Sequence, residues 1–159
     1  MADLLSVPPR WVTLRAATED GRPVVVLVDE AVALASPYDG FGLQVGLGVQ
    51  LGEPGPDGLP GPQEKAALRV FEQAMVDAVG ETGRLVATIT LPGVREYLIY
   101  ASTTSWAQQW AQTPPEGMTS HPFGLQAGED PHWHGLRQMA GLEAPPQEDQ
   151  PGTAQGGQL

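Results

Sequence analysis

The 159-residue sequence contains no cysteine and only one lysine, Lys65. The absence of cysteine excludes disulfide bonds, thiolate metal sites and cysteine nucleophiles, and it is consistent with a reducing compartment. Lys65 and seven arginines are outnumbered by 19 acidic residues, so the formal net charge is −11. Because clustered Lys and Arg bind phosphate backbones, we expect no direct binding of nucleic acid. We favour solubility as the role of this charge; a role in recognition would imply a basic partner, or mimicry of the charge of a nucleic acid.

Long hydrophobic runs and cofactor motifs are also missing. No run approaches the roughly 18 apolar residues that a membrane-spanning helix needs. Residues 1–9 include acidic Asp3 and lack the positive charge and apolar length of a signal peptide. There is no phosphate-binding loop and no nucleophile elbow. We therefore expect a cytoplasmic protein that enters no membrane and uses no cofactor.

Composition divides the chain into three parts. Residues 1–9 form an N-terminal arm that ends in two prolines, and residues 10–142 have the mixed composition of a single α+β domain. Residues 143–159 consist mainly of Pro, Gln, Gly and acidic residues with almost nothing to bury. Such a composition predicts a disordered tail.

Alternating apolar residues predict a strand over Leu43–Leu51, and Asp20-Gly21 between two strand-like runs predicts a hairpin with a type I′ turn. The all-apolar run Pro23–Val28 is typical of a strand covered on both faces. Gly46 and Gly48 share one face of the third strand. We favour a bulge or a packed aromatic side chain there over a ligand lying against that face.

Pro62–Val79 has helical periodicity, with Gly61 and Pro62 at its start and Gly80 at its end. The segments Arg84–Leu91 and Val94–Ala101 predict a hairpin about Pro92-Gly93. Because this pair favours a type II turn, we expect a longer loop or a bulge.

Three further elements are predicted toward the end of the domain. A short helix spans Ser102–Gln112, an edge strand spans Thr119–Ala127, and a final helix begins at Asp130-Pro131. The predicted fold is α+β: a mostly antiparallel sheet of five or six strands, with one main helix on one face and two short C-terminal helices.

Several short motifs, in their order and spacing over about Arg10 to Leu142, resemble the bacterial domain-of-unknown-function family numbered 695. They are Trp11, Pro56-Asp57-Gly58-Leu59-Pro60 with Glu64, Leu68 and Glu72, Gly93-Val94-Arg95-Glu96-Tyr97 with Tyr100, and Asp130-Pro131-His132-Trp133. The resemblance implies a small cytoplasmic α+β protein without assigned activity. Some members of the family are joined to a domain similar to the ribonuclease E regulator B, which implies regulation through protein binding.

The sequence therefore predicts a non-catalytic protein-interaction or regulatory domain. Trp is frequent at binding hot spots and Arg adds a charged anchor, so the candidate binding residues are Arg95, Tyr97, Trp106 and Trp110; the alternative is that the tryptophans fill the core. Two other functions stay open. One is an immunity-type antitoxin that covers a basic toxin, and the other is a metal-dependent hydrolase that uses His121, His132 and His134.

Overall fold

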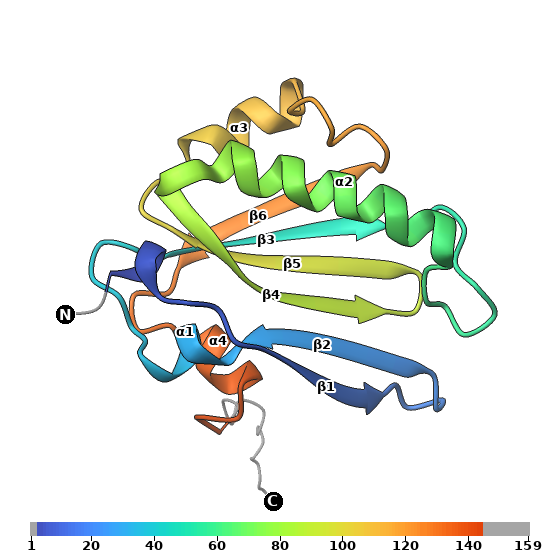
Figure 1. The fold of residues 1–159 in the computed structure, drawn as a ribbon, viewed down its shortest axis with the longest axis horizontal. Coiled ribbons are helices and arrows are strands. Elements are labelled where there is room, and N and C mark those ends of the chain that lie inside the picture. Colours follow the sequence, from blue (N-terminus) through green and yellow to red (C-terminus); the bar gives the residue numbers. More distant parts are fainter. Residues whose placement is uncertain (1–2, 145–159) are drawn as a thin grey trace, which may run out of the picture.

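A computed structural model describes residues 3–144, so the predicted tail lies almost entirely outside the described part of the chain. The strands form one antiparallel sheet in the order β1-β2-β4-β5-β3-β6 (Figure 1). The fold is thus α+β with six strands, as predicted. The strands are β1 (Trp11–Ala17), β2 (Pro23–Asp29), β3 (Leu43–Gln50), β4 (Gly83–Leu91), β5 (Val94–Ala101) and β6 (Phe123–Glu129), and the helices are α1 (Glu30–Leu34), α2 (Pro62–Val79), α3 (Ser105–Gln112) and α4 (His134–Met139).

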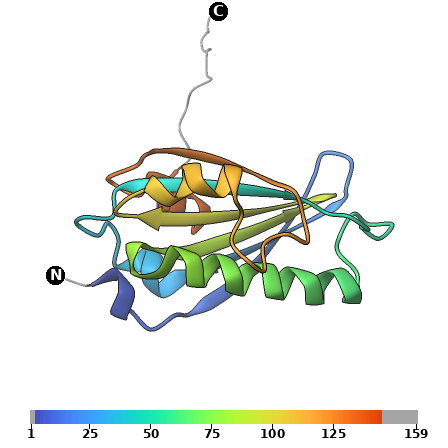
Figure 2. The same ribbon diagram turned by 90° about the horizontal axis from the view of Figure 1, so that it is seen from above.

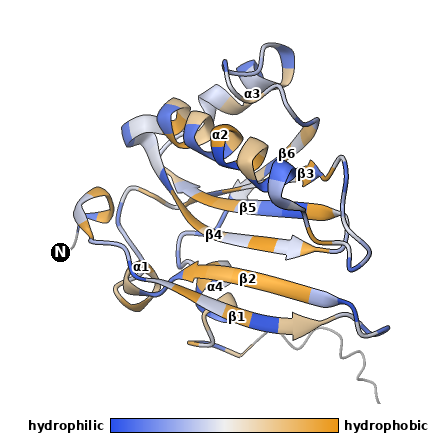
Figure 3. Cartoon of the chain, turned by 45° about the vertical axis from the view of Figure 1, so that its right-hand side comes forward, coloured by the Kyte–Doolittle hydropathy of each residue, from blue (hydrophilic) through white to orange (hydrophobic). Residues whose placement is uncertain are grey.

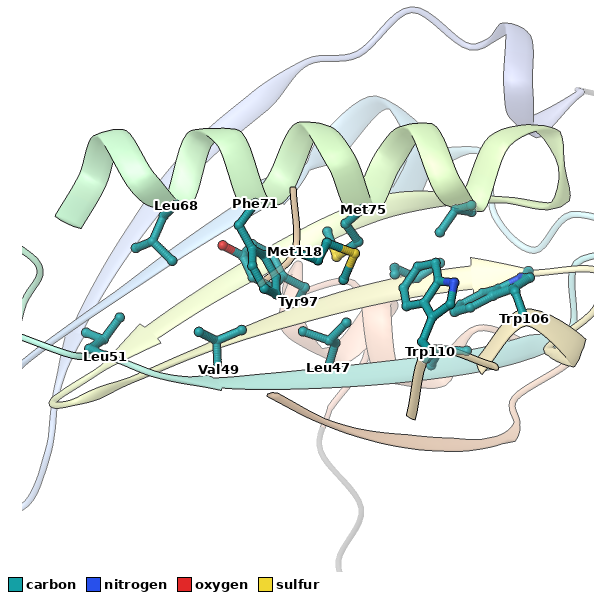
Figure 4. Packing of buried hydrophobic residues seen from close by; sticks show 14 residues of the cluster. Leu47, Val49, Leu51, Leu68, Phe71, Met75, Tyr97, Trp106, Trp110 and Met118 are labelled. Atoms are coloured by element: carbon teal, nitrogen blue, oxygen red, sulfur yellow. The ribbon is translucent and has the colours of Figure 1, made fainter. Parts of the chain in front are cut away.

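The main helix α2 has the predicted bounds and lies on what we call the helix face of the sheet (Figure 2). Leu68, Phe71, Met75 and Val79 point from α2 onto alternate residues of β3 and β5, with Trp106 and Trp110 of α3 at one end. Figure 4 shows these side chains between helix and strands. Burial of this stripe stabilises α2, because each large apolar side chain contributes about 1.5–3 kcal/mol.

A second, smaller core lies on the opposite side of the sheet, which we call the open face. Here α1 and α4 cover Val28 of β2, Ala87 of β4 and Tyr100 of β5. Both helices gather at one end of the sheet, away from the β1–β2 and β4–β5 turns (Figure 1). The remainder of the open face carries no helix from the described part of the chain.

Two of the predicted turns are wrong in detail. Only Gly21 has a positive φ in the β1–β2 hairpin, and its N–H donates to the Thr18 carbonyl at 2.9 Å. A type I turn followed by a left-handed glycine therefore replaces type I′. Pro92-Gly93 joins β4 and β5 without extra residues, because Leu91 pairs directly with Val94, and the register shift in this hairpin lies away from the turn, between Leu85 and Ala87. The Gly93 N–H donates to the Gly58 carbonyl, so the neighbouring loop holds this turn.

Burial of the apolar β2 run also differs from the prediction. Figure 3 shows most of β2 as hydrophobic, yet Leu27 is 37% exposed and only Val28 and Asp29 are buried. The described core beneath α2 takes its strand residues mainly from β3 and β5 and includes none from β2. The apolar run thus reflects two partly covered faces rather than complete burial.

The last two elements begin later than predicted. Residues 119–122 form a loop, and β6 starts at Phe123 as the predicted edge strand beside β3. The helix α4 starts at His134, because Trp133 adopts a left-handed conformation with φ 61°. Asp130 still caps the helix from upstream, since its carboxylate accepts the N–H groups of His134 and Gly135 at 3.0 and 2.9 Å. No helix in residues 3–144 has the length and apolarity to cross a membrane.

Candidate functional site

Arg95 and Tyr97 meet under helix α2, where both contact Glu72. The Tyr97 hydroxyl donates to Glu72 Oε2 at 2.9 Å, and Arg95 Nη1 lies 3.2 Å from the same oxygen. Tyr97 is buried, and this burial raises the pKa of its phenol. Arg95 Nε also donates to Thr90 Oγ1 at 3.0 Å. Through these polar contacts, Arg95 and Tyr97 of β5 connect the sheet to Glu72 of α2.

Trp106 and Trp110 form a separate pair on α3. Their ring centroids lie 4.4 Å apart, and both side chains are buried in the core beneath α2. Trp106 Nε1 donates to Thr82 Oγ1 at 3.1 Å. Of the four tryptophans, only Trp11 is largely exposed. A partner that used Trp106 or Trp110 would have to reach side chains that already pack inside the domain.

His121 is separated from the other two histidines by the sheet. It packs against Phe71 on the helix face, whereas His132 and His134 lie beside α4 with ring centroids 5.6 Å apart. His134 Nδ1 is 2.7 Å from Glu143 Oε1. Within residues 3–144, no group of three or more His, Cys, Asp or Glu is arranged to hold a metal ion. The three histidines therefore do not converge on one site in the described part of the chain.

His121 instead connects Ser120 to Glu64. Its Nδ1 lies 2.8 Å from Ser120 Oγ, and its Nε2 lies 2.8 Å from Glu64 Oε2. The carboxylate of Glu64 also accepts the backbone N–H groups of Gly52 and Glu53. This order of side chains is that of a hydrolase relay. The Glu64 carboxylate, however, also has a structural role. It connects the start of α2 to the loop after β3 and to the loop before β6.

We expect Glu64→Gln to lower the free energy of unfolding by about 1–3 kcal/mol at pH 7, because charge-assisted hydrogen bonds are weakened. Burial alone would raise the pKa of Glu64, but the hydrogen bonds from Gly52, His121 and Glu53 outweigh it and lower the pKa below its ordinary value of 4.5. This contribution is complete above pH 4.5 and disappears as the pH falls through the lowered pKa.

Urea denaturation at several pH values tests this expectation. The stability difference between the wild type and Glu64→Gln should shrink as the pH falls below about 4.5. Glu81→Gln, at an exposed carboxylate, is the matched control and should leave stability within about 0.5 kcal/mol. A difference that stays constant across this range would show that the charge on Glu64 is not the source of the stabilisation.

The uncovered part of the open face contains a groove with a glycine floor. Two cross-strand rows run over it: Ile89, Glu96, Gly48 and Gly124 form one row, and Ala87, Leu98, Gly46 and Gln126 form the other. The groove has a volume of about 580 Å³, and Met139 and Gly135 of α4 close one end. We call this site the glycine groove.

The glycines make the floor flat and leave its backbone accessible. A Cβ atom at Gly48 or Gly124 would meet nothing within 4 Å. Strand β3 pairs without a register shift with β5 over Leu43–Gln50 and with β6 over Leu43–Val49, so it contains no bulge. Neither a bulge nor an aromatic side chain therefore explains the glycines, which corrects the interpretation favoured from the sequence. Their backbone amides already pair within the sheet, so the floor offers van der Waals contact rather than free hydrogen-bonding groups.

Glu96 is the only charged residue in the two rows of the glycine groove. Its register partners are Ile89 on β4 and Gly48 on β3, and its side chain is exposed. No hydrogen bond or ion pair joins it to another described residue, whereas Glu64 and Glu72 in the other motif segments have such partners. An uncompensated carboxylate beside a flat apolar floor can attract a cationic group of a ligand.

Sequence reasoning identified Gly46 and Gly48 as unusual but missed Gly124, Glu96 and the wall from α4. A signal was present, because β6 has two glycines four positions apart, Gly124 and Gly128, which places both on one face of the strand. The register that brings Gly124 beside Gly48 comes from pairing between strands more than 70 positions apart in sequence. The sequence pattern within β3 or within β6 does not show that these two strands pair.

The family model described as "Family of unknown function (DUF695)" matches residues 10–139. The chain therefore belongs to this family, in agreement with the resemblance of its motifs. No curated protein and no solved structure matches the chain. Several motif residues hold the scaffold together: Glu64 and Glu72 hold α2, Tyr100 and Asp130 hold α4, and Trp133 stacks on Tyr100.

Proposed function

We propose that the protein is a non-catalytic interaction or regulatory domain of the cytoplasm, and that it binds a partner protein through the glycine groove. The observation that carries this proposal is the uncovered half of the open face, where glycine replaces side chains on two neighbouring strands. Glycine in strand interiors weakens a sheet, and it is typical of places where another backbone or ligand approaches closely.

Charge and chemistry favour the same function. The net charge of −11 suits a basic partner, and Glu96 lies where such a partner would contact the floor. An immunity-type antitoxin would use the same complementarity, and it is a special case of this proposal. The lack of cysteine favours the cytoplasm.

Site-specific photo-cross-linking in cells tests the proposed surface. A photoreactive residue in place of Gln126, at the edge of the groove, should give one predominant adduct, whereas the same residue at exposed Gln63 on α2 should not. Gly48→Val in the same chain should abolish the adduct, because a side chain then fills the floor. The cross-linked protein, purified separately, should bind the wild type directly.

Gly128→Val is the matched control, because Gly128 lies in β6 outside the groove lining and also has open space around its Cβ position. It should leave the adduct unchanged. Equal adducts from positions 126 and 63, or an adduct that is insensitive to Gly48→Val, would contradict the proposed surface.

A further inference from the structure

We infer that the ligand of the glycine groove is an extended segment of the partner that carries an arginine two positions from an apolar residue. This inference rests on the proposed function and names the chemistry of the ligand. The arginine would pair with Glu96 over Gly48, and the apolar residue would contact Leu98 and Met139.

The cation follows from the charge distribution on the open face. Around Glu96, the positions that the register places on this face are otherwise uncharged on every strand: Leu14, Ala16, Val24, Val26, Gly46, Gly48, Gln50, Ile89, Leu91, Val94, Leu98, Gly124 and Gln126. No basic side chain is among the described residues that line the groove, so a cationic group of the ligand can pair with Glu96. Partial removal of water by the ligand then strengthens the pair.

Arginine fits this surface better than lysine. Its planar guanidinium can lie flat on exposed peptide groups while two of its N–H groups donate to one carboxylate. The flat surface is present because Gly48 and Gly124, side by side in adjacent strands, have no side chains. An ammonium group would form the ion pair but would gain little from the floor.

The spacing of the groove indicates an extended segment. Glu96 and Leu98 lie on the same face of β5, two residues apart, which corresponds to about 6.6 Å along a strand. An extended peptide that runs along β5 presents alternate side chains with the same spacing. An arginine above Glu96 therefore places its second neighbour above Leu98, next to the Met139 side of the groove.

Selection of peptides tests the inference with a defined probe. A phage-displayed library of random 12-residue peptides is panned against the full chain, and the selected peptides are measured by fluorescence anisotropy. We expect enrichment of arginine with an apolar residue two positions away. Glu96→Gln should weaken these peptides about tenfold or more, while Glu81→Gln, at an exposed acidic residue outside the groove, should not.

The groove variants distinguish an error in the proposed ligand from an error in the proposed binding surface. If selected peptides lose binding in Gly48→Val but not in Gly128→Val, while arginine is not enriched or Glu96→Gln has no effect, the inference is wrong and the proposed surface stands. If no peptide is enriched, or if Gly48→Val binds the selected peptides normally, both are wrong. Thermal unfolding of each variant establishes that lost binding is not lost folding.

Discussion

Replacing Trp133 with alanine is expected to lower the free energy of unfolding by about 3–5 kcal/mol, the range for removing a large buried aromatic side chain. Trp133 has no exposed surface, and its ring stacks on Tyr100 with centroids 3.9 Å apart. Its Nε1 donates to the carbonyl of Phe41 at 3.0 Å. The alanine variant therefore loses packing and leaves the partly buried carbonyl of Phe41 without its partner.

Urea denaturation followed by far-ultraviolet circular dichroism measures this loss without relying on tryptophan fluorescence. Trp11→Ala is the matched control, because Trp11 is 45% exposed and should cost about 1 kcal/mol or less. Because α4 supplies Met139 and Gly135 to the glycine groove, Trp133→Ala should also weaken peptide binding there. Similar destabilisation in both tryptophan variants would show that Trp133 does not anchor α4.

The second large effect is expected at Asp29, which is fully buried. Its Oδ2 accepts from Arg84 Nη2 at 2.9 Å, and its Oδ1 accepts the N–H of Arg10 at 3.0 Å. Arg84 Nη1 in turn donates to the carbonyls of Leu4 and Val7 in the N-terminal arm. Asp29→Ala should lower the free energy of unfolding by about 3–5 kcal/mol, because it leaves an arginine without its charge partner.

Hydrogen exchange should locate the effect of Asp29→Ala in the arm. The backbone N–H of Arg10 loses its acceptor, and residues 4–7 lose the anchor that Arg84 holds in place, so both should exchange faster. Glu30→Ala is the matched control, since Glu30 pairs with Arg10 on the surface and such pairs contribute about 1 kcal/mol or less. Equal effects from the two variants would argue against a buried anchor.

Elements governed by local sequence were predictable. The helix Pro62–Val79 has a proline at its first position, an apolar stripe and a terminal glycine, and each of these acts within a few residues. The strand Leu43–Gln50 and the β4–β5 hairpin follow from alternation in the same way. Several residues of the family motifs form contacts between these elements, such as Glu72 with Tyr97 and Tyr100 with Asp130.

What the sequence did not reveal depends on contacts between distant segments. Glu64 sits at the third position of α2, which suggests a dipole effect, but its partner is His121, 57 positions later in the chain. Asp130 predicted a helix start, but a turn precedes α4. In this turn Tyr100 donates to Asp130, and Trp133 has a left-handed conformation. The binding candidates Tyr97 and Trp106 were chosen by residue type, and only tertiary structure showed that their side chains are buried.

Glu96 and Gln126 are exposed on the glycine groove and have no side-chain bond to the rest of the described chain. Exchanging such residues costs little stability, because nothing that packs the domain together is disturbed. In the proposed interaction, substitutions at these two positions would therefore change the preferred ligand, for instance Glu96→Lys toward acidic ligands. In a protein built this way, recognition can diversify while the architecture beneath it is preserved.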